Sequence, residues 1–458
     1  MSLLDKPIRK KRIVVLGAGF AGLTFCRRFR SEFAEIILID RQNHHLFQPL
    51  LYQVATAGLS MPEISRPIRS ILSRRKNVTV LMDEVTGIDA ENKHVILKAQ
   101  KEPLAFDYLV IGLGAQNDYF GHPEWEAHAP GLKSLDDAIR IRQNLLLAFE
   151  QAEITEDPET QRRLLTIAVI GGGPTGVELA GACAELARVI LRRDFRRIDP
   201  EKTKIILIEA GERILSAFDP ELSAEAEKQL RRLGVNILKN EPVQSISKEQ
   251  VVLKDLTIQA GTILWGAGVR GNPLATKLGI ELDSKGRIPV RADCSLNHHR
   301  NIFAVGDIAT LKDGLGQPVP TVSPAAMQMA SHVARIIRDE IECRTQITHN
   351  RPSFVYNNKG SMATIGRAAA IAQMGRLKLK GYPAWLAWLF VHLIFLVGFR
   401  NKAFVLLQWA WSYFTYGSGS RVISGMDKTF RIKPFAVNPA SRVDELAQME
   451  NQNTGSGI

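Results

Sequence analysis

Cysteine is scarce in this chain of 458 residues, which has only four: Cys26, Cys183, Cys294 and Cys343. They lie far apart, and no two of them form a CxxC pair. This spacing argues against a zinc ribbon, a disulfide framework and a redox-active dithiol, each of which needs closely placed cysteines. Enzymes that relay electrons through a cysteine pair, such as disulfide reductases and sulfide:quinone reductases, are disfavoured for the same reason. A reducing compartment fits this cysteine usage best.

Export and metal-binding signals are also missing. Residues 1–11 are basic but contain no apolar core of signal-peptide length, so we expect no export. The adjacent His44 and His45 would point to opposite faces of an extended chain and make poor joint ligands. We therefore expect no bound metal.

Positive charge is abundant, with a formal net charge of +12 and a pI near 9.5. Such an excess suggests an anionic partner, which nucleic acid, an anionic membrane surface or phosphorylated cofactors would each supply. The composition, 45% hydrophobic and 23% charged, is that of a folded protein, and the length allows two or three domains.

A glycine-rich turn lies near the start of the chain, in the sequence KRIVVLGAGFAG at residues 11–22. Gly17 would make the tight turn, Gly19 would let a pyrophosphate approach the backbone, and Gly22 would let helix and strand pack closely. The next strand ends in Asp40, near the spacing expected for a contact with a ribose hydroxyl. Strand, turn, helix and acid together predict a dinucleotide-binding unit rather than an ordinary glycine turn.

The same design occurs a second time. A strand over residues 165–170 leads into Gly171, Gly173 and Gly176, and a following strand ends in Glu209. Two complete fingerprints imply two dinucleotides held by two similar domains. One would be FAD and the other a nicotinamide nucleotide.

Glu209 indicates which nicotinamide nucleotide is bound. Its carboxylate would accept hydrogen bonds from the adenosine ribose and repel a 2′-phosphate. The small Ala210 and Gly211 that follow offer no arginine for such a phosphate, although Arg213 lies close in the sequence. We therefore expect NADH over NADPH. NADPH stays an alternative because Arg213 is close enough in the sequence to bind a 2′-phosphate.

Several short segments predict how the sheets are completed. The β-rich pieces 78–81, 85–88 and 95–97 indicate a small antiparallel meander, and 108–111 indicates its return into the parallel sheet. A later strand ends in Asp307, which would hydrogen-bond a ribitol chain or, as the alternative, cap the helix that follows.

The C-terminal region contains an almost wholly apolar stretch, 384–399, and a second apolar run that ends at Phe414. Four of the six tryptophans lie there: Trp385, Trp388, Trp409 and Trp411. Sixteen helical residues reach roughly 24 Å, short of the roughly 30 Å hydrocarbon core, so a monotopic hairpin is favoured over a membrane span. Basic residues nearby would meet anionic headgroups: Arg376, Lys378, Lys380, Arg400 and Lys402. The alternatives are a buried helical pair or a dimer interface, since segments of this length are often core helices.

Four motifs together resemble the two-dinucleotide-binding-domain flavoproteins: Gly17–Gly22, Gly171–Gly176, Phe303–Asp307 and Tyr108–Ala115. Within that superfamily, His45–Tyr52 and the C-terminal region resemble the type II NADH dehydrogenases. The resemblance implies an α/β fold of two Rossmann-like dinucleotide-binding domains, one inserted in the other, plus a C-terminal α-helical membrane-attachment region. It implies an FAD domain over 8–140 and 276–345, an NADH-binding domain over 160–275 and membrane anchoring by 346–450.

The resemblance also implies site residues. FAD contacts are expected at Gly17, Gly19, Phe20, Ala21, Gly22, Asp40, Arg41, Gln48, Val85, Ala115, Asp307 and Ala326. NADH contacts are expected at Gly171, Gly173, Gly176, Glu209 and Gly268. Glu178 falls on a position that the family places near the nicotinamide and the flavin. The alternative for Glu178 is a solvated first-turn acid favoured by the helix dipole.

The family's quinone motif is only partly matched. Gln328 falls on its second glutamine, whereas Pro324 replaces the first and removes a side-chain donor. Quinone contact is therefore expected to rest on Gln328, on backbone groups and on Lys359.

The implied activity is electron transfer from NADH through FAD to a membrane quinone, ubiquinone or menaquinone, without proton pumping. The resemblance places the enzyme on the cytoplasmic face of the cell inner membrane as a peripheral, monotopic protein attached through residues 380–416. It implies no nucleic-acid partner and leaves a homodimer open.

Two other functions remain as alternatives. One is a soluble NADH-dependent flavoprotein reductase of an iron–sulfur electron carrier, whose basic charge would suit an acidic partner. The other is a non-enzymatic redox sensor that NADH binding switches.

Overall fold

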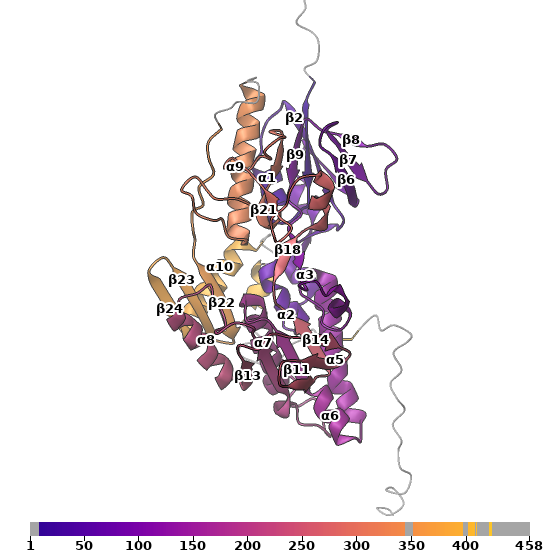
Figure 1. The fold of residues 1–458 in the computed structure, drawn as a ribbon, viewed down its shortest axis with the longest axis vertical. Coiled ribbons are helices and arrows are strands. Elements are labelled where there is room, and N and C mark those ends of the chain that lie inside the picture. Colours follow the sequence, from indigo (N-terminus) through magenta and orange to yellow (C-terminus); the bar gives the residue numbers. More distant parts are fainter. Residues whose placement is uncertain (1–8, 344–350, 397–401, 408, 410–420, 424–458) are drawn as a thin grey trace, which may run out of the picture.

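The computed structural model describes residues 9–343, 351–396, 402–407, 409 and 421–423. Two α/β units lie one above the other, and the C-terminal elements lie beside them (Figure 1). The colours along the chain show that the upper unit combines the start of the chain with much later residues, whereas the lower unit uses the residues between. In the ranges described, no helix combines the length and the apolar character needed to cross a membrane.

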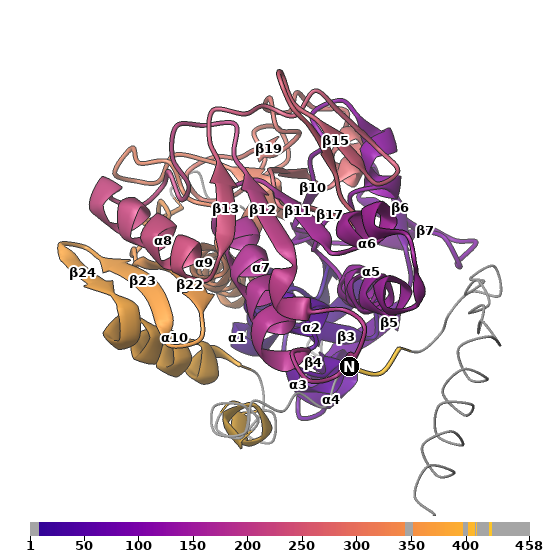
Figure 2. The same cartoon turned by 90° about the horizontal axis from the view of Figure 1, so that it is seen from below.

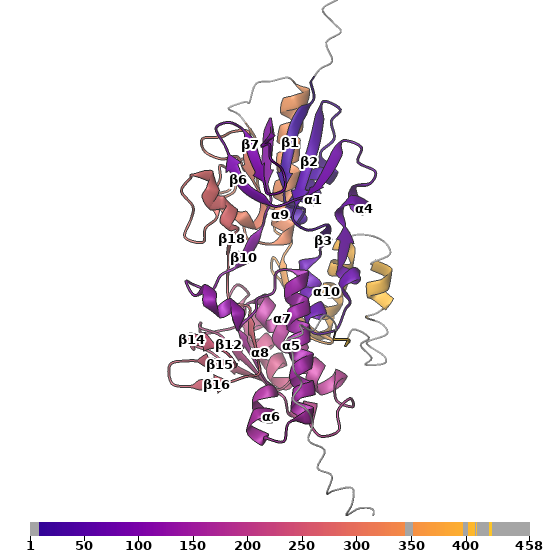
Figure 3. The same cartoon turned by 90° about the vertical axis from the view of Figure 1, so that its right-hand side faces the viewer.

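The first sheet has five parallel strands in the order β20, β9, β1, β2 and β5. Their bounds are Ile302–Ala304, Tyr108–Ile111, Lys11–Leu16, Ala34–Asp40 and Val78–Met82, respectively. The central strands read as continuous apolar runs because both faces of a parallel sheet are covered. Helices α1 (Phe20–Arg28) and α9 (Ser323–Glu342) lie against each other beside this sheet (Figure 3).

The predicted meander is partly wrong. Strand β5 pairs in parallel with β2, from Val78 opposite Ile36 to Met82 opposite Asp40, so it belongs to the first sheet. The antiparallel meander consists only of β6 (Val85–Asp89), β7 (His94–Leu97) and β8 (Leu104–Ala105). The sequence of β5 does not show which strand it pairs with, because it is a short, partly covered strand at the edge of the sheet.

The second sheet has four parallel strands in the order β13, β12, β11 and β17. Their bounds are Val235–Leu238, Lys204–Ile208, Thr166–Ile170 and Thr262–Trp265. Four helices accompany it (Figure 2): α5 (Leu135–Ile154), α6 (Pro158–Leu164), α7 (Pro174–Glu185) and α8 (Pro220–Arg232). The chain leaves and re-enters the first unit through an antiparallel pair, β10 (Ala115–Asn117) with β18 (Val269–Gly271). The second Rossmann-like unit is thus inserted in the first, as predicted.

The C-terminal region begins with a sheet that the sequence analysis missed. Strands β22 (Ser361–Gly366), β23 (Ala369–Met374) and β24 (Leu377–Lys380) form an antiparallel sheet that contacts α7 and α8. Helix α10 (Gly381–Phe395) packs on β23, and residues 402–407 and 409 are also helical. The predicted helical region is therefore preceded by a three-stranded sheet. The rest of the second apolar run, including Trp411, lies outside the described residues.

Lys378 and Lys380, which were expected to meet anionic headgroups, form ion pairs with acids of the second unit. Lys378 Nζ lies 2.7 Å from Asp219 Oδ2, and Lys380 Nζ lies 3.6 Å from Glu221 Oε1. Both acids lie at the start of α8, so these lysines attach the C-terminal sheet to the second unit.

The remaining short strands and α-helices complete the architecture. They are β3 (His44–Leu46), β4 (Ser65–Pro67), α2 (Leu51–Ala55), α3 (Met61–Ile64), α4 (Ile68–Leu72), β14 (Ser245–Ser247), β15 (Gln250–Val252), β16 (Thr257–Gln259), β19 (Ile288–Pro289) and β21 (Ala309–Thr310). In β3, His44 is partly exposed and His45 is buried, so the two histidines do face opposite ways.

Candidate active site

The first glycine turn joins β1 to α1, and its three glycines have separate steric reasons. Gly17 has a φ of +90°, and a Cβ there would lie 2.6 Å from Gly112 O. A Cβ on Gly22 would lie 1.9 Å from Gly17 O, so only glycine lets the helix pack this closely. At Gly19 a Cβ would meet nothing within 4 Å, which leaves open space in front of the helix N-terminus. That space, with N–H groups that no side chain caps, fits a pyrophosphate.

Asp40 holds this turn from the end of β2. Its Oδ2 accepts a hydrogen bond from Ala18 N at 2.6 Å, and its Oδ1 accepts one from Gln42 N at 2.8 Å. The carboxylate is thus fixed beside the turn, where a ribose hydroxyl would meet it.

The second glycine turn repeats this geometry between β11 and α7. Gly171 has a φ of +102°, a Cβ on Gly176 would lie 1.8 Å from Gly171 O, and a Cβ on Gly173 would meet nothing within 4 Å. Glu209 Oε2 accepts a hydrogen bond from Gly172 N at 2.6 Å, as Asp40 does from the first turn. Its Oε1 accepts one from Gly211 N at 2.6 Å.

Asp307 lies in a buried corner where predicted flavin residues come together. The neighbouring Gly306 has a φ of +77°, and a Cβ there would lie 3.2 Å from Ala326 Cβ and 3.6 Å from Ala21 Cβ. Burial raises the pKa of Asp307, and the charges of Lys133 and Arg287 oppose this rise. Asp307 does not cap a helix, because Val305 occupies the N-cap position of its short 3-10 turn.

Lys133 is a site residue that the sequence analysis missed. Burial lowers the pKa of its ammonium group, and the negative charge of Asp307 opposes this shift. Gln48 Nε2 donates to the Lys133 carbonyl at 3.0 Å, so the loop that carries Lys133 is tied to a predicted FAD residue. No motif includes Lys133, and only the folded chain places it opposite Asp307.

The other predicted cofactor residues lie at the starts of strands or helices, or just after strands. Ala115 starts β10, Val85 starts β6, and Arg41 is exposed just after Asp40. Gly268, with a φ of +99°, follows the second sheet, and a Cβ there would lie 2.7 Å from the Phe120 ring. Phe20 starts α1, packs partly buried against the hydrophobic core and also lines the cavity that Phe395 and Leu396 help to form.

Glu178 lies on α7 where the second unit meets α2 and the C-terminal sheet. Burial raises its pKa to about 8, and a hydrogen bond from the backbone N–H of Thr364 partly opposes this rise. A solvated first-turn acid would not show such a shift, so that alternative is wrong. A carboxyl group with a pKa near 8 holds or releases a proton at neutral pH.

Gln328, one of the two predicted quinone residues, is bonded to the segment that carries the other, Lys359. Gln328 Nε2 donates to Asn357 O at 3.0 Å, and its Oε1 accepts from Asn357 N at 2.9 Å, so both ends of this amide are occupied. Lys359 is exposed on the segment after Asn357.

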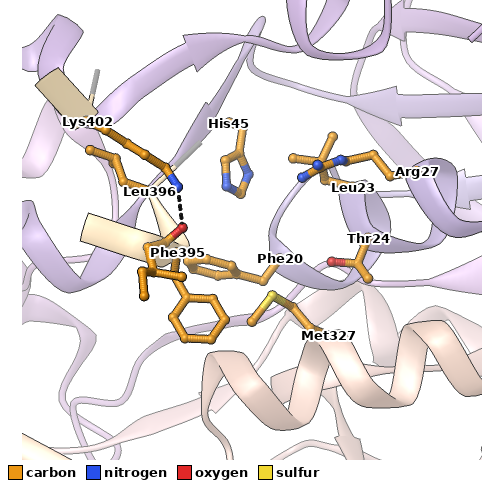
Figure 4. A pocket seen from close by; sticks show the side chains of 10 residues that line it. Phe20, Leu23, Thr24, Arg27, His45, Met327, Phe395, Leu396 and Lys402 are labelled. Atoms are coloured by element: carbon orange, nitrogen blue, oxygen red, sulfur yellow. Dashed lines mark hydrogen bonds between the residues drawn. The ribbon is translucent and has the colours of Figure 1, made fainter. Parts of the chain in front are cut away.

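A cavity of about 390 Å³ lies between α1, α9 and the end of α10 (Figure 4). It is lined by six apolar residues, Phe20, Leu23, Met327, Ile394, Phe395 and Leu396, and by four polar ones, Thr24, Arg27, His45 and Lys402. Gln328 and Lys359 do not line it. The wall is therefore mainly apolar and carries two cationic nitrogen donors, Arg27 and Lys402, which suits a ring that carries carbonyl oxygens.

His45 supplies the buried polar group of this cavity wall. Its Nδ1 lies 2.9 Å from Ala18 O and must donate, because a carbonyl oxygen only accepts. Its Nε2 is buried and has no hydrogen-bond partner in the described chain. Burial lowers the pKa of His45, so its ring is neutral at neutral pH.

The fold and the paired turns define a two-dinucleotide-binding oxidoreductase. Residues 11–330 match the model of the pyridine nucleotide-disulphide oxidoreductase family, and residues 358–416 match that of the NDH2 C-terminal domain. The chain is 37% identical to the type II NADH:quinone oxidoreductase Ndh of Mycobacterium tuberculosis, over 98% of this chain and 96% of that protein. It belongs to the type II NADH:quinone oxidoreductase family.

Two further relatives agree with this placement. The external NADH-ubiquinone oxidoreductase 2 of Saccharomyces cerevisiae mitochondria is 28% identical over 89% of this chain and 82% of that protein. The solved structure of NDH2 from Plasmodium falciparum in complex with NADH superposes with a TM-score of 0.82. It covers 91% of this chain and 100% of that chain at 21% identity, a likeness of fold.

Proposed function

We propose that this chain oxidises NADH with bound FAD and passes the electrons to a quinone without pumping protons. The observation that carries this proposal is the repeated geometry of the two glycine turns, each with an acid bonded to its backbone. The named relatives support quinone reduction over the soluble reductase of an iron–sulfur carrier.

The two units would divide the cofactors between them. In the first unit, the turn at Gly17 to Gly22, Asp40 and Asp307 would hold FAD, with Lys133 opposite Asp307. In the second, the turn at Gly171 to Gly176 and Glu209 would hold NADH. FAD, when bound, supplies a flavin ring that accepts a hydride and then donates two electrons.

Glu178 would act as the proton-holding group near the site of hydride transfer. Its half-buried position on α7 and its pKa near 8 support this role, since such a carboxyl changes protonation easily at neutral pH.

The cavity beside Met327 would admit the quinone ring. Its place between α9 and the end of α10 supports this role, because Ile394 and Phe395 belong both to the cavity wall and to the exposed apolar surface. The quinone contacts expected at Gln328 and Lys359 would then be indirect, with Gln328 holding Asn357 in place.

The exposed stripe of α10 would attach the protein to the cytoplasmic face of the cell inner membrane. Tyr382, Leu386, Phe390 and Ile394 recur every four residues and are 46–66% exposed. Phe404, Leu406 and Leu407 add exposed apolar side chains from the next helical segment. A contiguous apolar surface of this kind marks a membrane or protein contact. The alternative is that a second copy of the chain covers this surface in a homodimer.

Vesicle flotation of the double variant Leu386→Gln, Phe390→Gln tests the attachment. We expect lost binding to phospholipid vesicles and lower turnover with a long-chain quinone, but normal turnover with a short-chain analogue. Leu315→Gln, at an apolar residue 70% exposed elsewhere, is the matched control. Unchanged flotation together with a shift from dimer to monomer would instead assign the stripe to a homodimer.

Met327→Trp tests the cavity. We expect the larger ring to fill the space, so that NADH still reduces the flavin while reoxidation by quinone slows at least tenfold. If reoxidation is unchanged, the quinone enters elsewhere.

A further inference from the structure

A line of polar contacts runs from the C-terminal helical segment into the core. The Trp409 indole N–H donates to Gln53 Oε1 at 2.9 Å, and Gln53 Nε2 donates to Tyr52 Oη at 2.8 Å. Gln53 thus uses its acceptor toward Trp409 and its donor toward Tyr52. Because the two ends of the amide differ, the bond to Trp409 fixes which end Tyr52 meets.

Thr364 extends this line to Glu178. Its side chain hydrogen-bonds to the Tyr52 phenol, and its backbone N–H donates to the Glu178 carboxylate. Tyr52 is only 7% exposed, and burial raises its pKa, with the negative charge of Glu178 as the next cause. Tyr52 and Glu178 therefore share one neighbour, Thr364, and the charge of Glu178 acts on the phenol.

We propose that Gln53 and Tyr52 are positioning residues that couple the seating of Trp409 to the proton affinity of Glu178. The proposal rests on the role proposed for Glu178. When Trp409 is seated, Gln53 orders the phenol, and the phenol bonds to the side chain of Thr364, whose strand the pairing of β22 with β23 holds beside the carboxylate. When Trp409 leaves, the Gln53 amide and the Tyr52 phenol lose this order, so the phenol dipole next to Thr364 stabilises the ionised carboxylate less. Glu178 then holds its proton more tightly.

Few other groups act on Glu178. Helix α2 contributes Tyr52 and β22 contributes Thr364. On α7 itself, Glu185 lies seven residues away, and its carboxylate is held by the backbone N–H of Arg367. Burial and the Thr364 bond account for the pKa of Glu178, so no ion pair masks a change in this line. The consequence is that attachment of the C-terminal segment adjusts the site of NADH oxidation.

The test measures the pKa of Glu178 in the FAD-loaded full chain. The carboxylic acid band in the infrared spectrum, identified by its loss in Glu178→Gln, is followed against pH. The rate of flavin reduction by NADH is followed in parallel. Trp409→Phe and Tyr52→Phe each remove one hydrogen-bonding group and keep an aromatic ring.

The matched control is Trp388→Phe. Trp388 lies on α10 with its ring 5.7 Å from that of Trp409, but its indole N–H has no hydrogen-bond partner in the described chain. We expect Trp409→Phe and Tyr52→Phe each to raise the proton affinity of Glu178 threefold to tenfold, seen as a higher pH midpoint of its carboxylic acid band. Their combination should shift it no further, and Trp388→Phe should leave it in place. Equal midpoints in Trp409→Phe and Trp388→Phe, or fully additive shifts, would overturn the coupling.

The two measurements, the infrared titration and the rate of flavin reduction, separate this coupling from the role of Glu178. If Glu178→Gln keeps the pH dependence of flavin reduction, the proposed role of Glu178 fails, and the infrared midpoint still decides the coupling. If Glu178→Gln removes that dependence while Trp409→Phe shifts neither midpoint, only the coupling fails.

Discussion

The carboxylate of Glu209 accepts a hydrogen bond from the backbone N–H of Gly172 at 2.6 Å. The acid that would recognise the ribose therefore also fixes the turn that would hold the pyrophosphate. We expect Glu209→Gln to lower the preference for NADH over NADPH by roughly tenfold, since charged hydrogen bonds contribute about 1.5–3 kcal/mol. Stopped-flow reduction of the flavin by each nucleotide measures this ratio.

The corresponding acid of the first turn provides the control. Asp40→Asn should weaken FAD retention, measured by fluorescence of released flavin, and leave the nucleotide preference unchanged. An unchanged preference in Glu209→Gln would remove the role assigned to that residue, with Arg213 as the next candidate.

Two glycines of the second turn should respond differently to the same added methyl group. Gly176→Ala places a Cβ 1.8 Å from Gly171 O, so we expect a loss of about 3 kcal/mol in the free energy of unfolding. Gly173→Ala places a Cβ in open space, so the fold should persist while NADH binds at least tenfold more weakly. Denaturant unfolding and NADH titration separate the two effects. Normal NADH affinity in Gly173→Ala would contradict a pyrophosphate at this turn.

Glu178 predicts a specific pH dependence of stability. Its pKa is raised to about 8 in the folded chain from the ordinary value of 4.5, so the folded state binds the proton more tightly than the unfolded state. The stability that this proton contributes is complete below about pH 4.5 and is lost as pH rises toward 8. We expect the stability of the wild-type chain relative to Glu178→Gln to fall between pH 5 and 8. A difference in the free energy of unfolding between the two proteins that stays constant from pH 5 to 8 would contradict the raised pKa of Glu178.

A buried ion-pair network should be essential to the first unit. Arg351 contacts Glu340 at 2.7 Å and Asp293 at 3.4 Å, and its side chain is 2% exposed. Removing one partner of such a pair leaves a buried charge unpaired, so we expect Arg351→Met to lower stability by about 3–5 kcal/mol. The control is Arg338→Met, whose pair with Asp339 is exposed and worth about 0–1 kcal/mol. Similar losses in both variants, measured by denaturant unfolding, would contradict this account.

The sequence predicted the two nucleotide turns well because glycine spacing and a strand-end acid impose a local geometry. Gly17, Gly22 and Asp40 could be placed from their immediate neighbours alone. Lys133 could not, since its partner Asp307 lies far along the chain and no motif joins them. The C-terminal sheet was missed because strands β22 and β23 lie before a much stronger apolar signal, that of α10. Strand β5 was assigned to the wrong sheet because its pairing with β2 depends on the assembled fold.

The quinone contacts show a similar limit. Gln328 was chosen by its place in a motif, and the bonds of its amide to Asn357 could be found only in the folded chain, so its contact with quinone stays a prediction. The cavity is formed by α1, α9 and the end of α10 together, so no single stretch of sequence indicates it.

The central claim is that electrons pass from NADH to a quinone through FAD bound to this chain. Sequential-mixing stopped flow of the FAD-loaded protein tests it most directly, with NADH added first and ubiquinone or menaquinone analogues second. We expect the flavin absorbance to be bleached by NADH and restored by a quinone at a rate that accounts for steady-state turnover. Bleaching by NADH without reoxidation by either quinone would contradict the account.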